Sequence, residues 1–156
     1  MKKLFSALFI LLFSHAIFAQ EVSKSYDKIE RFDQGVARVW IGGHCGLISQ
    51  ATKKEIIPVI YDKIGSFGHD ALAITSKDGM KGLITIEGKV IVGNIYTSIG
   101  DFHGPYAITR KNGLAGMINK QGKVLIENKY EEIRVEGNGI IRGKKDGKEV
   151  LLTVKD

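Results

Sequence analysis

Chemically distinctive residues are scarce in this chain of 156 residues. Cys45 is the only cysteine, so no intrachain disulfide can form and the fold must depend on packing alone. The sequence contains no C-x-x-C or H-E-x-x-H pair of the kind that binds zinc. It also contains no phosphate-binding loop, no G-x-S-x-G elbow and no dinucleotide-binding fingerprint. These absences argue against the most readily recognised classes of enzyme.

Helical periodicity is missing as well. Beyond the N-terminal segment, no window of 11 or more residues places apolar side chains at helical spacing. The composition, 44% hydrophobic and 26% charged, is ordinary for one globular domain and too apolar for a disordered chain. We therefore expect a single folded unit built from β-strands.

The longest apolar run lies at the N-terminus. Lys2 and Lys3 precede the run 4–13, and a softer stretch ends at Ala19. Even extended to Phe18 the run has about 15 residues, fewer than the roughly 20 needed to cross a bilayer. We predict a signal peptide cleaved before Gln20, with a permanent anchor as the alternative. No cysteine lies at the expected cleavage site, so the sequence does not suggest a lipid anchor. The expected location is therefore periplasmic or secreted, without a stable membrane anchor after cleavage. Removal of 1–19 lowers the formal charge from +6 to +4.

A tyrosine phrase recurs through the rest of the chain. It reads YDKIERFDQGVA from Tyr26, YDKIGSFGHDALA from Tyr61 and YTSIGDFHGPYA from Tyr96, and a weaker copy, YEEIRVEGNGII, starts at Tyr130. The tyrosines are 35, 35 and 34 residues apart, which is a period typical of repeat proteins. The last copy is degenerate, as terminal repeats often are.

Each copy carries a hairpin signature. An apolar pair is followed five residues later by a turn dipeptide: Gly42-Gly43, Asp78-Gly79, Asn112-Gly113 and Asp146-Gly147. Because Gly, Asn and Asp adopt positive φ most cheaply, these dipeptides predict a two-residue type I′ turn in all four copies.

A returning strand follows each turn. It reads Gly-Leu-Ile or Gly-Met-Ile in three copies and Val150-Leu151-Leu152 in the fourth. A second turn at Glu87-Gly88 and Gln121-Gly122, replaced in the first copy by ATKK, leads to a further apolar segment. The predicted fold class is all-β, with tandem β-meander or hairpin repeats of about 35 residues stacked into one curled sheet or solenoid-like array.

The predicted domain organisation follows from this repeat. A signal peptide (1–19) and a short polar lead (20–25) precede one repeat domain (26–156), with copies at 26–60, 61–95, 96–129 and 130–156. A single hairpin is marginal in water, so the copies should share one apolar layer. The residues expected in that layer are Tyr26, Ile29, Phe32, Ala37 and Leu47, with their equivalents Tyr61, Ile64, Phe67, Ala73 and Leu83.

The order Tyr-Asp-x-Ile-x-x-Phe, apolar-Ala pair, hairpin turn and Gly-Leu-Ile resembles the WG-repeat family of bacterial proteins, also called KWG repeats. The resemblance covers about residues 26–156. The tryptophan of the name-giving pair is absent, because the corresponding positions read Cys45-Gly46, Lys81-Gly82, Ala115-Gly116 and Glu149-Val150. The resemblance implies a β-rich repeat scaffold that serves as an interaction or binding module, and it supplies no active-site residues.

Two groups of residues are catalytic or metal-binding candidates. His44 and Cys45 pair a base with a nucleophile beside a glycine-rich turn, but adjacent residues on a strand point to opposite faces. His69 and His103 lie in equivalent loops and, together with His44, form a candidate three-histidine metal site. The ordinary alternative is a plain thiol and solvated loop histidines, and we favour it.

Acidic and basic residues recur near the hairpins. Asp27, Asp62 and Glu131 follow three of the tyrosines and are expected to have a structural role near the turn. Basic residues gather around the hairpin turns and would form a positive stripe along one edge if the hairpins stack in register: Lys77, Lys81, Arg110, Lys111, Arg142, Lys144, Lys145 and Lys148. The alternative is that these lysines only protect exposed strand edges against aggregation.

The expected function is an exported, non-enzymatic β-repeat module that binds a protein or an anionic cell-envelope polymer, with no cofactor. Nucleic acid is not expected as a partner, because an envelope polymer or an acidic protein suits an exported chain better. The alternative is an enzyme or a metal-dependent binder that uses His44, Cys45 and the loop histidines.

Export can be tested directly. N-terminal sequencing of the protein released by secreting cells should give Gln20 as the first residue, because the charged start, the short apolar run and Ala19 occur together. Recovery of the chain in the membrane fraction with Met1 retained would show that the N-terminal segment is an anchor.

Overall fold

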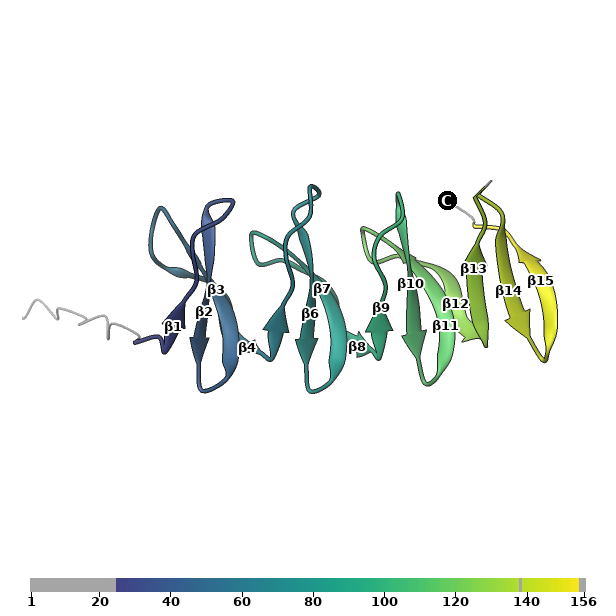
Figure 1. Ribbon diagram of the computed structural model, residues 1–156, viewed down its shortest axis with the longest axis horizontal. Coiled ribbons are helices and arrows are strands. Elements are labelled where there is room, and N and C mark those ends of the chain that lie inside the picture. The colour runs from purple at the N-terminus through teal and green to yellow at the C-terminus, as the bar shows by residue number, and fades with distance from the viewer. Residues whose placement is uncertain (1–24, 138, 155–156) are drawn as a thin grey trace, which may run out of the picture.

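The computed structural model describes residues 25–137 and 139–154. The expected signal peptide and most of the polar lead lie outside this range. Within it the chain forms only β-strands, arranged in four antiparallel sheets. The sheets stand side by side in chain order along the long axis of the molecule (Figure 1). The all-β repeat prediction is therefore confirmed, and no candidate membrane-spanning helix occurs among the described residues.

Each sheet corresponds to one repeat. The first contains β1 (Lys28–Ile29), β2 (Val36–Ile41), β3 (His44–Ser49) and β4 (Glu55–Tyr61). The second contains β5 (Lys63–Ile64), β6 (Leu72–Lys77), β7 (Met80–Thr85) and β8 (Val90–Tyr96). The third contains β9 (Ser98–Ile99), β10 (Tyr106–Lys111), β11 (Leu114–Asn119) and β12 (Val124–Tyr130). The fourth contains β13 (Glu132–Val135), β14 (Ile141–Lys145) and β15 (Lys148–Leu152).

The hairpin turns have the backbone geometry that their residues predict. Asp78 and Gly79 have φ of 51° and 74°, and Asn112 and Gly113 have φ of 52° and 78°. The corresponding residues of the first and fourth repeats also have positive φ. Both central residues of a type I′ turn require this conformation, so the turn prediction is confirmed.

The fourth strand of each complete sheet, here called the closing strand, lies very close to a glycine of the third strand. Cα pairing between β7 and β8 shifts between Lys81 and Leu83, and the neighbouring sheets show the same irregularity. A Cβ atom on Gly82 would lie 2.6 Å from the carbonyl oxygen of Val92, and one on Gly116 would lie 2.7 Å from that of Ile126. The geometry that the first three repeats share thus requires glycine here, because the closing strand leaves no room for a side chain.

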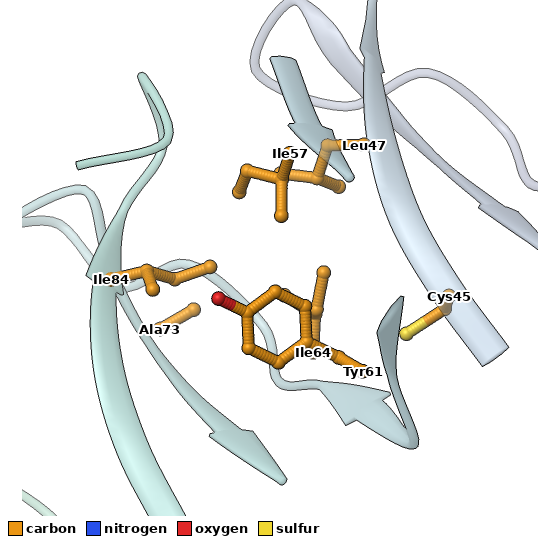
Figure 2. Packing of buried hydrophobic residues seen from close by; sticks show 7 residues of the cluster. All are labelled: Cys45, Leu47, Ile57, Tyr61, Ile64, Ala73 and Ile84. Atoms are coloured by element: carbon orange, nitrogen blue, oxygen red, sulfur yellow. The ribbon is translucent and has the colours of Figure 1, made fainter. Parts of the chain in front are cut away.

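The core lies between repeats. Leu47 and Ile57 from the first sheet share one buried cluster with Ile64, Ala73 and Ile84 from the second. Figure 2 shows the ring of Tyr61 between the two groups. Equivalent clusters join the second repeat to the third and the third to the fourth. Each repeat therefore buries its apolar side chains mainly by contact with its neighbours.

This arrangement corrects the expected single layer. The sheets are separate rather than one curled sheet, and the buried residues form four clusters. Ile29, expected in the core, has 54% of its surface exposed, whereas its equivalent Ile64 has 2%. Tyr26, Phe32 and Phe67 are only partly buried at the margins of clusters. The physical reason is that Ile64 packs against the repeat before its own, and no described residues precede the first repeat in that way.

A polar pair fastens the closing strand in the two central repeats. Thr75 and Thr109 are buried at 1% and 0% exposure. The side-chain amide of Asn94 donates to Thr75 Oγ1 at 3.0 Å, and that of Asn128 donates to Thr109 Oγ1 at 3.1 Å. Each amide also reaches a main-chain carbonyl at 3.1 Å, that of Met80 or Leu114. These hydrogen bonds offset the free-energy cost of removing the threonine hydroxyl groups from water.

The first repeat has apolar side chains in place of this threonine and asparagine pair. Val39 and Val59 occupy the positions of the threonine and the asparagine, and Val39 is fully buried. Hydrogen bonds instead connect the first repeat to the second. Arg38 Nε donates to the carbonyl of Ile64 at 2.9 Å, and Arg38 Nη2 donates to that of Gly65.

Truncation at a repeat junction should reveal where the core lies. Ile64→Ala should cost about 2 to 5 kcal/mol of unfolding free energy, because it opens a cavity in a closed cluster. Ile29→Ala is the matched control at the same repeat position and should cost less than about 1 kcal/mol, because that side chain is already half exposed. Urea denaturation of both variants measures the difference. Equal losses would contradict the placement of the core between repeats.

The threonine and asparagine pair makes a second prediction. Thr75→Val alone should destabilise the protein by about 1 to 3 kcal/mol, because it removes an acceptor from the Asn94 amide. The double variant Thr75→Val with Asn94→Val should recover much of that loss, since it reproduces the valine pair of the first repeat. Thermal unfolding of the single and double variants tests this, and additive losses would show that the two side chains act independently.

Candidate functional site

The four hairpin turns lie along one edge of the array. Figure 1 shows the β2–β3, β6–β7, β10–β11 and β14–β15 turns pointing in the same direction. The sequence-predicted basic residues lie on the strands that these turns join. Lys77 and Lys81 flank the second turn, Arg110 and Lys111 precede the third, and the fourth is surrounded by Lys144, Lys145 and Lys148. The first turn, Gly42-Gly43, has no lysine or arginine beside it.

The ion pairs of these residues divide them into two groups. Among the predicted basic residues, four lysines form no side-chain hydrogen bond or ion pair with other described residues: Lys77, Lys111, Lys145 and Lys148. Lys144 lies 3.6 Å from Glu131, and Lys81 donates to Ser76 Oγ at 3.1 Å. Arg110 donates to main-chain carbonyls, of which that of Gly113 is 3.3 Å away. The side chains of these four lysines are therefore available to contact a partner.

Arg142 lies apart from the others. Its Nε donates to Glu136 Oε1 at 2.6 Å, and this ion pair raises the pKa of the guanidinium above its ordinary value. In the β14–β15 hairpin it pairs with Leu151, at the opposite end from the turn. The structure thus brings seven of the eight predicted residues to the hairpin edge and leaves Arg142 away from it.

The acidic residues that follow the tyrosines brace the turns. Asp27 Oδ2 accepts a hydrogen bond from the main-chain nitrogen of Gly42 at 2.7 Å, and Glu131 Oε1 accepts one from Gly147 at 3.0 Å. Thr97, in the equivalent position, donates to the carbonyl of Arg110 at 3.0 Å. These contacts hold the first, third and fourth hairpins against the strand before them, which fits the structural role expected for Asp27 and Glu131. Asp62 differs, because its carboxylate lies 3.5 Å from His44 Nδ1 of the first repeat.

His44 and Cys45 are separated by burial. His44 Nδ1 lies 3.5 Å from Asp62 Oδ1 at the surface, whereas Cys45 is fully buried. Burial raises the pKa of the Cys45 thiol, and the main-chain N–H of Ile64 offsets this only in part. The thiol therefore resists ionisation and faces the core cluster (Figure 2).

The loop histidines belong to different repeats. His69 lies between β5 and β6, and His103 forms an isolated bridge with Tyr106. Across residues 25–137 and 139–154 there is no group of three His, Cys, Asp or Glu side chains placed to hold a metal ion. The structure does not bring the three candidate histidines together.

The position that precedes the repeat glycine has a packing role that sequence reasoning missed. Cys45, Lys81 and Ala115 each pair with the tyrosine that opens the next repeat, Tyr61, Tyr96 and Tyr130 respectively. Tyr61 and Tyr96 are 6% and 4% exposed. The tyrosine ring therefore fills space at this site, opposite a cysteine, an alanine or the stem of a lysine. The recurrence of tyrosine 14 or 15 residues after each glycine was the available signal.

A groove between the third and fourth repeats was also missed. It has a volume of about 720 Å³, and its apolar walls come mainly from Tyr106, Leu125, Ile141, Leu151 and Leu152.

Comparison with known protein families agrees with this repeat geometry. The family model described as the WG containing repeat matches residues 46–80, 82–114 and 116–148, which is more than half of the chain. The three matched segments begin at Gly46, Gly82 and Gly116, the glycines against which the fourth strand of each sheet lies. No curated protein and no solved structure matches the chain.

Proposed function

Because this chain belongs to the WG-repeat family, we propose that it is an exported, non-enzymatic β-repeat module whose hairpin edge binds an anionic partner. The partner is an acidic protein or an anionic cell-envelope polymer. The single observation that carries the proposal is the alignment of the hairpin turns along one edge, with four lysines whose side chains form no hydrogen bond or ion pair with other described residues.

The spacing of the charges suits an extended ligand. Successive repeats present lysines at Lys77, Lys111 and Lys145, which occupy the last position before the turn in three consecutive hairpins. A polymer with regularly spaced negative groups can contact several repeats at once, so weak individual contacts add along the chain. Clustered charge of one sign also attracts an oppositely charged ligand more strongly than the same charge dispersed over the surface.

Edge protection alone explains this pattern less well. Lysines that blunt aggregation belong on exposed strand edges. Lys77 and Lys111 instead lie at the hairpin ends of β6 and β10, strands that pair with neighbours on both sides. Since these strands have no free edge, their terminal lysines are available for recognition.

Binding to poly-L-glutamate, measured by fluorescence anisotropy, tests the proposal. The affinity should fall as salt rises from about 50 mM to about 500 mM, because exposed charges are then screened. The double variant K111E/K145E should bind much more weakly than the unmodified protein.

The matched control is K53E/K89E, which makes the same change in net charge at the second turns, away from the hairpin edge. It should retain most of the binding. An equal loss in the two double variants would mean that only net charge matters, and the hairpin edge would not be the binding surface.

A further inference from the structure

The C-terminal face of the array exposes a residue that is buried in every other repeat. Leu47, Leu83 and Met117 occupy one position on the third strand of their repeats, and none is more than 1% exposed. Leu151 occupies the same position on β15 and is 68% exposed. The difference arises because the first three side chains face both a closing strand and the next repeat.

The N-terminal face shows the complementary exposure. Ile64, Ile99 and Ile133 follow the tyrosines of the second, third and fourth repeats and are 2%, 8% and 5% exposed. Ile29, at the same position in the first repeat, is 54% exposed.

These two positions meet at the internal junctions. Leu47 shares a core cluster with Ile64, Leu83 with Ile99, and Met117 with Ile133. The two ends of the array therefore expose the two halves of a contact that the molecule itself makes three times.

The fourth repeat also has an open strand edge. β15 pairs with β14 on one side, and no strand among the described residues pairs with its other side. In the first three repeats this second side carries β4, β8 or β12. The groove of about 720 Å³ separates part of β15 from the third repeat, with Leu151 and Leu152 on one side and Tyr106 and Leu125 on the other.

The polar lead has the sequence register of a closing strand. Counting back four residues from Tyr61, Tyr96 and Tyr130 gives Ile57, Val92 and Ile126, which are 2%, 8% and 7% exposed. Those side chains pair across the sheet with Leu47, Leu83 and Met117. Counting back four residues from Tyr26 gives Val22. Residues 20–25 thus carry an aliphatic side chain where a closing strand needs one.

We propose that copies of this chain associate head to tail, with the first repeat of one copy stacked on the fourth repeat of the next. In this junction Leu151 of one copy lies against Ile29 of the other, as Leu47 lies near Ile64 within the chain. Residues 20–25 of the second copy pair with the open edge of β15 and place Val22 opposite Leu151. Strand addition of this kind satisfies the unpaired main-chain groups of an open edge.

One residue makes this junction weaker than an internal one. Val150 stands where the other repeats have glycine, and a Cβ atom at Gly82 or Gly116 would come within 2.7 Å of the closing strand. An added strand must therefore lie farther from β15 near Val150 than β8 lies from β7. The association is consequently reversible rather than a permanent extension of the fold.

The junction joins two different surfaces, so it is a heterologous contact. Such contacts produce open chains or closed rings, and they do not stop at a symmetric dimer. Stacking in this way would also continue the row of hairpin turns from one copy to the next. The inference rests on the apolar ends of the array, independently of whether the hairpin edge binds an anionic partner.

Sedimentation velocity of the protein purified from cells that express the full chain tests the proposal. The measurement is made without any anionic polymer and at about 0.5 M salt, where surface charges are largely screened. The weight-average mass should rise with protein concentration and pass beyond that of a dimer, or reach the mass of a closed ring. A single monomeric species across the concentration range would overturn the proposal.

Two variants identify the surfaces involved. Leu151→Lys blocks only the C-terminal face and Ile29→Lys only the N-terminal face, and both replace exposed side chains, so the fold should survive, as thermal unfolding can verify. Each variant alone should be monomeric. An equimolar mixture should give a one-to-one dimer and nothing larger, because one intact face of each kind remains. Self-association of either variant alone, or no dimer in the mixture, would contradict head-to-tail stacking.

Two further variants test the strand. Val150→Gly should tighten the association, because it restores the room that a closing strand needs, whereas Val22→Asp should abolish it. Unchanged association in Val22→Asp, or weaker association in Val150→Gly, would refute the pairing of residues 20–25 with β15. A failure of poly-L-glutamate binding would leave all of these outcomes unaffected, so the two proposals fail separately.

Discussion

Burial between neighbouring repeats is the interaction on which this structure depends. A sheet of four short strands has too little apolar surface to be stable alone, and stacked sheets share what each lacks. The cluster of Leu47, Ile57, Ile64 and Ala73 shows the principle, because its members come from two repeats and close only when both are folded. Stability in such an array is a sum of nearest-neighbour terms, so the terminal repeats are the ones with partly unsatisfied surfaces.

The close crossing of the closing strand determines the details of the repeat. Gly82 and Gly116 lie under a main-chain carbonyl, which leaves no space for a β-carbon. The crossing in turn brings a tyrosine opposite the residue before the glycine, as at Cys45 and Tyr61. This chain belongs to the WG-repeat family, and the tyrosine on the opposite strand explains how a cysteine, an alanine or the stem of a lysine suffices there without a tryptophan. Its ring supplies apolar volume at the site from the other strand.

The same architecture leaves one edge free for recognition. Because packing uses the faces of the sheets, the hairpin turns project away from every junction (Figure 1). The residues flanking those turns carry no core function, so their charge is free to vary from repeat to repeat. The absence of basic residues beside Gly42-Gly43 and their abundance around Asp146-Gly147 show such variation. A scaffold of this kind separates the residues that hold the fold from those that contact a partner.

The turns and the strand order were determined by the sequence itself, because they depend on local conformational preferences. Asp78-Gly79 and Asn112-Gly113 form the turns that their residues favour. The identity of the basic residues near the turns was equally readable, although the ion pair that draws Arg142 to Glu136 was not. Only the tertiary structure decided which members of an identical set are buried. Ile29 and Ile64 stand in the same local phrase, and Leu47 and Leu151 occupy the same position of the repeat, yet their exposures are 54% against 2% and 1% against 68%. Burial requires a neighbour, and that neighbour belongs to another repeat, so no local pattern can specify it.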